Sequence, residues 1–186
     1  MTFAKLFSGA AVAAALIAGT ATAETWDMPT PYPDATFHTQ NISQFAEDVA
    51  EATNGDLTIN IHSAGSLFKH PEISRAVRSG QVPIGEFFLS LLNNDNPVFG
   101  ADSLPFLATD YDQAARLWEA QRPVVEELLA EQGLMVLYAV PWPPQGLYTT
   151  QEIDTVDDLS GLKFRTYNAT LETFASMVGA APTQVE

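Results

Sequence analysis

The 186-residue sequence contains no cysteine, which excludes disulfide bonds, a thiol nucleophile and cysteine-ligated zinc or iron–sulfur sites. Basic residues are also scarce, with 8 Lys and Arg against 23 Asp and Glu and a formal net charge of −15. Because nucleic-acid binding depends on clustered Lys and Arg, no nucleic-acid partner is expected. Hydrophobic residues nevertheless make up 46% of the chain and charged residues only 17%, so the chain can build a packed core.

The familiar motifs of catalysis and nucleotide binding are missing as well. The sequence has no G-x-S-x-G, Walker, G-x-G-x-x-G or H-E-x-x-H pattern. The three histidines, His38, His62 and His70, show no metal-ligand spacing to carboxylates, and the acidic pairs along the chain are typical of solvated helix faces. We therefore expect no enzymatic activity, no metal and no cofactor.

The first 23 residues have the three parts of a secretory signal. Lys5 lies in a short basic head, an apolar run covers residues 10–19, and the small-residue stretch 20–23 suits signal peptidase. The apolar run is about half of the roughly 20 residues that a membrane-spanning helix needs, so a membrane anchor is disfavoured. Since no cysteine follows the cleavage site, a lipoprotein is excluded. We expect residues 1–23 to be a signal peptide and the mature protein to lie in the periplasm.

Downstream, strand-like and helix-like segments alternate, which predicts an α/β fold with a largely parallel sheet. Strands are expected at 25–28, 57–62, 82–88, 134–140 and 162–165. Helices are expected from residue 37 to a stop at 54–55, from 71 to 80, from 111 to 133, as one turn within 155–161, and from 169 onward. Pro123 is expected to break or kink the long helix.

The last four residues, Thr183 to Glu186, match the capping-box pattern T-x-x-E and predict the start of a helix. A chance match is the alternative, because the pattern is short. If a helix does begin here, ending the chain would leave its first N–H groups without partners. We therefore expect this sequence to be the N-terminal portion of a longer protein.

Residues 161–169 carry the most specific chemical pattern in the chain. Apolar residues alternate with Lys163 and Arg165, which gives a short strand one apolar and one cationic face, and Asn168 is a good N-cap for the next helix. A guanidinium beside a helix N-terminus is suited to binding a carboxylate. An ordinary surface arginine paired with Asp157 or Asp158 has the same spacing, so both interpretations remain open.

A second cluster lies in the segment PWPPQGLY over residues 141–148. Its three prolines cannot continue a central strand, so the chain must leave the sheet here. Trp142 and Tyr148 offer amphipathic walls and Gln145 can donate and accept hydrogen bonds, as expected where a hinge borders a ligand cleft. A structural linker with its aromatic side chains packed into the core is the alternative.

Several segments together resemble the solute-binding subunits of tripartite ATP-independent periplasmic (TRAP) transporters of the DctP type. They are FAEDVAEATNGDLTINIHSAGSLF, LYTTQEIDTVDDL, GLKFRTYNAT and GAAPTQVE. The resemblance implies two α/β lobes joined by crossing strands, with 24–144 as lobe I and 145–186 as the hinge crossover and the start of lobe II. It also implies that Arg165 clamps the ligand carboxylate and that Asn168 faces the ligand nearby. The first-lobe contacts that it implies are Phe37, His38, Lys69, His70, Glu86 and Phe88.

One position departs from a part of that family. Members that bind sialic acid carry a further arginine where this sequence has Leu147, so sialic acid is not expected as the ligand. A pocket with aromatic walls and one arginine suits a monocarboxylate or a small keto or hydroxy acid. A dicarboxylate would require a second cation such as Lys69.

The function predicted from these features is capture of a small organic acid in the periplasm and its delivery to a TRAP-type membrane permease. The protein itself would not span the membrane. One alternative is the binding subunit of an ABC-type or tricarboxylate-type uptake system. A less favoured alternative is a periplasmic enzyme whose active site lies in a missing C-terminal half.

Overall fold

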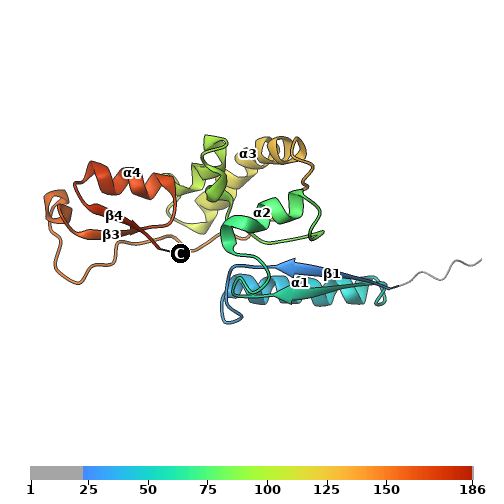
Figure 1. Ribbon diagram of the computed structural model, residues 1–186. Helices are drawn as coiled ribbons and strands as arrows, with labels where there is room; N and C mark the ends of the chain where they lie inside the picture. The colour runs from blue at the N-terminus through green and yellow to red at the C-terminus, as the bar shows by residue number, and fades with distance from the viewer. Residues whose placement is uncertain (1–22, 186) are drawn as a thin grey trace, which may run out of the picture.

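The structure is a computed structural model that describes residues 23–185 (Figure 1). The expected signal peptide, apart from its last residue, lies outside the described residues. Within the described part of the chain, no helix combines the length and the apolar character needed to cross a membrane.

The N-terminal unit is a β-α-β motif made of β1 (Glu24–Pro29), α1 (Phe37–Ala52) and β2 (Leu57–His62). The two strands pair in parallel, with Met28 opposite Ile61. Met28 packs with Ile42 of α1 and with Ile84 to form the first hydrophobic core. Residues 54 and 55 end the helix in left-handed conformations, with φ of 51° and 82°, as the Asn-Gly stop predicts.

The C-terminal unit repeats the motif with β3 (Lys163–Thr166), α4 (Ala169–Met177) and β4 (Ala181–Gln184). These strands are also parallel, so the predicted strand–helix–strand pattern is confirmed at both ends of the chain. The helix start predicted at Thr183 is wrong. Thr183 pairs with Arg165 in the β3–β4 ladder, and these backbone hydrogen bonds hold the residues extended.

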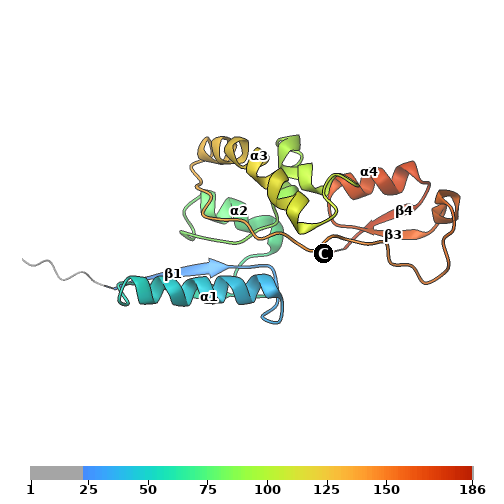
Figure 2. The same cartoon turned by 180° about the vertical axis from the view of Figure 1, so that it is seen from behind.

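Between the two units lie α2 (His70–Arg78), two 3₁₀ segments, η1 (Leu89–Leu92) and η2 (Pro97–Ser103), and the long helix α3 (Tyr111–Ala130). The Asp110 side chain caps α3 by accepting a hydrogen bond from the Gln113 N–H at 2.7 Å. Pro123 does not break α3, which continues through it. The axis of α3 does change direction partway along in Figures 1 and 2, as a kink at an internal proline requires.

Two predicted strands, 82–88 and 134–140, have no strand ladder in the described chain. Segment 82–88 runs beside β1 but makes a single backbone bond to it, from Glu86 N–H to the Pro29 carbonyl at 3.0 Å. In segment 134–140, Leu134 and Val136 pack on the second core, while Met135 is 80% exposed. Both segments are therefore extended but unpaired, because a strand requires a neighbouring backbone as well as an apolar sequence.

The second core lies under α3 and joins it to the 3₁₀ segments. Its buried residues are Phe99, Val125 and Leu129. Beyond α3 the chain crosses the molecule in extended form and reaches the C-terminal unit, as Figures 1 and 2 show. A short 3₁₀ turn, η3 (Val156–Leu159), precedes β3 and has the predicted capping box between Thr155 and Asp158.

Candidate functional site

Arg165 projects from β3 with an exposed side chain. Its Nε donates a hydrogen bond to the Val185 carbonyl at 2.9 Å, and its Cζ lies 5.1 Å from the centroid of the Tyr167 ring. Neither aspartate considered as its partner forms an ion pair with it within residues 23–185, and Asp158 instead accepts hydrogen bonds from Thr155. The two terminal guanidinium nitrogens therefore have no protein partner in the described chain, which suits a fork that receives a carboxylate.

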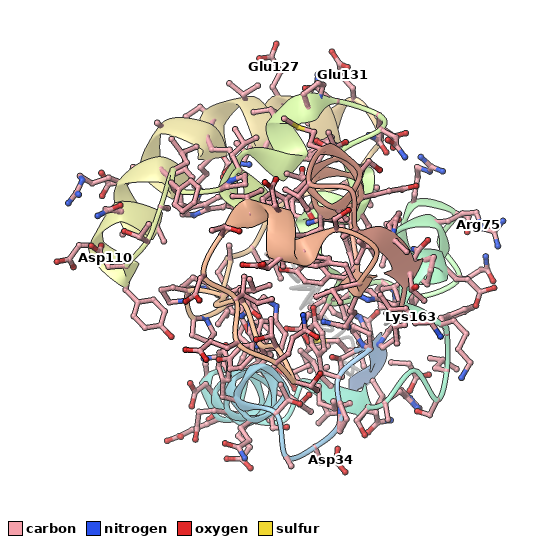
Figure 3. The ribbon with its side chains drawn as sticks, turned by 90° about the vertical axis from the view of Figure 1, so that its left-hand side faces the viewer. Asp34, Arg75, Asp110, Glu127, Glu131 and Lys163 are labelled. Carbon is pink, nitrogen blue, oxygen red and sulfur yellow. The ribbon has the colours of Figure 1, made fainter. Side chains whose placement is uncertain are left out.

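The other charged groups of this region point elsewhere. Lys163, on the same strand face as Arg165, is exposed, and Arg75 of α2 points outward from the molecule in Figure 3. Among the acidic side chains labelled there, Glu127 of α3 and Glu131, which directly follows the helix, also extend into solvent.

Asn168 caps α4, as its sequence position predicts. Its Oδ1 accepts a hydrogen bond from the Leu171 N–H at 3.0 Å. Its Nδ2 donates to the hydroxyl oxygens of Ser90 and Ser103, both at 3.1 Å, and the residue is only 9% exposed. The structure therefore engages this amide in protein contacts close to Arg165.

A series of aromatic contacts leads from Arg165 to the crossover segment. Tyr167 contacts Phe88, with ring centroids 5.9 Å apart, and the Phe88 N–H donates to Nε2 of His70 at 2.9 Å. Tyr32 then contacts both His70 and Trp142 edge-on, at 5.7 and 5.1 Å. Residues from five separate segments thus form one series of contacts between the crossover and the guanidinium.

His70 is held as a neutral ring. Burial lowers its pKa from 6.5 to about 4, and its Nε2 must carry a lone pair to accept the Phe88 N–H. This side chain therefore fixes the backbone at residue 88 and does not supply positive charge for an anion.

Glu86 is a largely buried carboxyl group near the same rings. It accepts a hydrogen bond from the Thr30 hydroxyl, and burial raises its pKa although this bond opposes the rise. Burial raises the pKa of Tyr32 to about 12, opposed by its contact with Trp142 and reinforced by the charge of Glu86. A carboxylate among neutral rings is suited to accept hydrogen bonds from a polar ligand.

Trp142, in the crossover segment, packs against the start of α1. Its ring lies 4.1 Å from that of His38 and 5.5 Å from that of Phe37, measured between centroids. Nε2 of His38 bonds to the Val140 carbonyl at 3.3 Å, while its buried Nδ1 has no partner among the described residues. Burial lowers the pKa of His38, so this ring is also suited to the neutral state.

Three expected site residues lie outside these contacts. The Gln145 amide turns back to the Pro143 carbonyl at 3.0 Å, and Tyr148 is 90% exposed. Nζ of Lys69 donates to the Gly65 carbonyl at 3.2 Å, so this ammonium is held at the loop before α2.

A groove of about 430 Å³ lies between α4 and the 93–105 segment, away from most of the predicted residues. Its lining contains no charged residue and consists of Asn93, Leu104, Pro105, Ala169, Thr170, Thr173, Phe174 and Met177. A carboxylate needs a cation or several N–H donors, so Arg165 marks the candidate anion site better than this groove does.

Sequence reasoning missed Tyr32, Thr30 and Tyr167. Tyr32 lies in the proline-rich loop after β1, and Tyr167 lies between Arg165 and the Asn168 cap. An aromatic residue next to a predicted anion-binding arginine was a usable signal for Tyr167. The pairing of Thr30 with Glu86 depends on contacts 56 residues apart and has no local signal.

Solved structures match the fold closely. DctP6 of Bordetella pertussis, an extracytoplasmic solute receptor binding pyroglutamic acid, is 46% identical with a TM-score of 0.85 over 87% of this chain and 54% of its own. A marine metagenome TRAP solute binding protein specific for pyroglutamate is 45% identical with a TM-score of 0.85, over 89% of this chain and 54% of its own. The described fold thus corresponds to part of a two-lobed periplasmic binding protein, as expected.

Curated relatives extend further than this chain does. A solute-binding protein of Chromohalobacter salexigens is 28% identical over 82% of this chain and 46% of its own length. One of a Sulfitobacter species is 29% identical over 91% of this chain and 52% of its own length. The chain therefore spans about half the length of the curated relatives that it matches. The family profile described as bacterial extracellular solute-binding protein, family 7, matches residues 30–186, and this chain accordingly belongs to that family, DctP.

Proposed function

We propose that this chain forms the ligand-capturing part of a TRAP-type periplasmic receptor that binds a small organic acid and delivers it to a membrane permease. The observation that carries the proposal is the Arg165 guanidinium, which lies over the ring of Tyr167 and whose terminal nitrogens have no partner among residues 23–185. Residues 24–144 would form lobe I, and residues 145–186 the hinge crossover and the start of lobe II. Residues 1–23 would direct export and be removed.

The charges of the site favour a monocarboxylate over a dicarboxylate. Arg165 is the cation beside the aromatic series, and the ammonium of Lys69 is bonded to the Gly65 carbonyl. A second ligand carboxylate would also be repelled by the buried carboxyl of Glu86 when ionised.

Pyroglutamate is the first ligand to test. It carries one carboxylate, for Arg165, on a small lactam ring whose faces suit aromatic walls. Its ring N–H is a donor for which the Glu86 carboxyl is a suitable acceptor. The related receptors at 44–46% identity that bind it support this choice.

The test uses the complete natural protein, with calorimetric titration of pyroglutamate, lactate, glucuronate and succinate. We expect pyroglutamate to bind most tightly and Arg165→Ala to abolish measurable binding. Lys163→Ala is the matched control, because it removes a cation from the same strand face without touching the aromatic series, and it should bind normally. Unchanged affinity of Arg165→Ala for every bound carboxylate would contradict the assignment.

A further inference from the structure

The hydrogen bonds of Asn168 define the orientation of its amide. Oδ1 must face the α4 backbone, because it accepts from the Leu171 N–H, and Nδ2 must therefore face the two serines. The Ser103 hydroxyl donates its hydrogen to Oδ1 of Asp102 at 3.4 Å. Its oxygen can therefore accept a hydrogen bond from Asn168. Both amide hydrogens and one oxygen lone pair are thereby used, so only one lone pair remains available.

The partners of this amide come from distant parts of the chain. Ser90 lies in η1 and is 2% exposed, and Ser103 ends η2, so the contacts span 78 and 65 residues. Asn168 at the same time begins α4 of the C-terminal unit. One buried side chain thus ties the C-terminal β-α-β unit to the two 3₁₀ segments of the preceding part.

A second contact runs beside this one. Tyr167 packs against Phe88, so residues 167 and 168 contact residues 88 and 90 respectively. Phe88 is itself held by His70, and the Arg165 guanidinium lies over Tyr167. The position of the guanidinium relative to lobe I therefore depends on residues 165–168, which the hydrogen bonds of Asn168 hold against Ser90 and Ser103.

We infer that Asn168, through Ser90 and Ser103, is a positioning residue that sets Arg165 against the first lobe, and not a group that hydrogen-bonds the ligand. The inference rests on the proposed function, because it needs Arg165 to bind the carboxylate. It gives Ser90 and Ser103 a role in holding Asn168 in place, although neither serine belongs to a recognisable sequence motif. It also predicts that ligand affinity depends on side chains that do not contact the ligand.

The test uses two kinds of substitution in the complete protein. Asn168→Ser keeps an N-cap oxygen for α4 but is too short to reach the two serines. The double variant Ser90→Ala with Ser103→Ala keeps Asn168 and removes its acceptors, leaving two buried N–H groups unpaired. We expect each to weaken pyroglutamate binding about tenfold, while circular dichroism shows a folded protein.

Combining the changes separates positioning from direct contact. The triple variant should bind no more weakly than Asn168→Ser alone, because all three side chains act through one interaction. Each variant should also show a smaller preference for pyroglutamate over the analogue in which a carboxamide replaces the carboxylate. The reason is that a displaced Arg165 binds the carboxylate more weakly. Thr173→Ala, on the exposed part of α4, is the control and should change neither quantity.

The outcomes distinguish this inference from the proposed function. Normal affinity and carboxylate preference in the double serine variant, with binding lost in Asn168→Ser, would overturn the inference and restore Asn168 as a ligand contact. Wild-type protein that binds no carboxylate, or Arg165→Ala that binds normally, would overturn the proposed function and the inference with it.

Discussion

The guanidinium of Arg165 lies over the ring of Tyr167, with Cζ 5.1 Å from the ring centroid. The Val185 carbonyl accepts from Nε at 2.9 Å, so a ring face and a backbone oxygen together restrain the fork. Lysine cannot reproduce this arrangement, because its ammonium is a point charge without a planar face. The pair therefore explains why an arginine suits this position.

The Tyr167 ring should contribute to affinity through the arginine. Tyr167→Phe keeps the ring face and should bind pyroglutamate within about twofold of wild type, whereas Tyr167→Leu should weaken binding about two- to fivefold. The reason is the loss of a cation–π contact worth about 0.5–1 kcal/mol at an exposed site. Calorimetric titration measures both variants, and equal affinities for the leucine and phenylalanine variants would show that the ring face is not used.

His70 should make stability depend on pH in the acid range. Folding lowers its pKa from 6.5 to about 4, so below pH 6.5 the unfolded chain binds a proton that the folded chain does not. Its contribution to stability is therefore complete above 6.5 and is lost as the pH falls towards 4. The shift corresponds to at most about 3 kcal/mol, which solvent around the ring reduces to about 1–2 kcal/mol.

Replacing the imidazole tests that dependence. His70→Gln keeps an acceptor for the Phe88 N–H but does not titrate. Urea unfolding at pH 7 and at pH 4.5 should show a smaller loss of unfolding free energy for this variant than for wild type. An identical loss in both proteins would mean that another group causes the acid sensitivity.

Glu86→Gln should stabilise the free protein at neutral pH while weakening ligand binding. Burial raises the pKa of Glu86, so its protonated form is favoured in the fold, and its contribution to stability declines as the pH rises from the unfolded-state pKa towards the folded-state value. Glutamine retains an acceptor for Thr30 without the charge, and we expect a gain of roughly 0.5–2 kcal/mol in unfolding free energy.

The matched control for Glu86→Gln is Glu126→Gln. Glu126 is an exposed partner of Arg122 in α3, so its replacement should change the unfolding free energy by less than about 0.5 kcal/mol. If Glu86→Gln instead lowers the unfolding free energy, the ionised carboxylate makes a net favourable contact that its burial does not reveal.

The fold could be predicted from the sequence wherever the signal is local. The alternation in 57–62, the Asn54-Gly55 stop and the Asn168 cap each depend on neighbouring residues, and each is confirmed. The strands expected at 82–88 and 134–140 were wrong because pairing depends on a distant backbone, which an apolar run does not specify.

In the candidate site, too, the features that depend on neighbouring residues could be predicted, and those that depend on distant residues could not. The neighbours of Arg165 in sequence indicated an anion site, and in the part of the chain that the structure describes its terminal nitrogens have no hydrogen-bond partner. The contacts of Thr30 with Glu86 and of Asn168 with Ser90 cross 56 and 78 residues, and no spacing rule in a single sequence reaches that far. Direct contact of the predicted site residues with a ligand stays a prediction.

Gly85 should tolerate no side chain, because α2 packs directly on it. A Cβ placed there would lie 2.8 Å from Cγ2 of Ile73 and 3.0 Å from Cγ2 of Val77, both on α2. Gly85→Ala must therefore displace the helix or the 84–88 segment, and we expect a loss of about 1–3 kcal/mol in unfolding free energy. Because residue 85 precedes Glu86, the displacement should also weaken ligand binding.

Gly146→Ala provides the contrast within the crossover. The nearest atom to its added Cβ would be Cε2 of Tyr148 at 3.9 Å, an ordinary contact distance, so unfolding free energy should change little or rise slightly. Urea unfolding and titration of both alanine variants measure the two effects together. If Gly85→Ala keeps wild-type stability and affinity, then α2 and the 84–88 segment separate at no measurable cost, and their packing does not position Glu86.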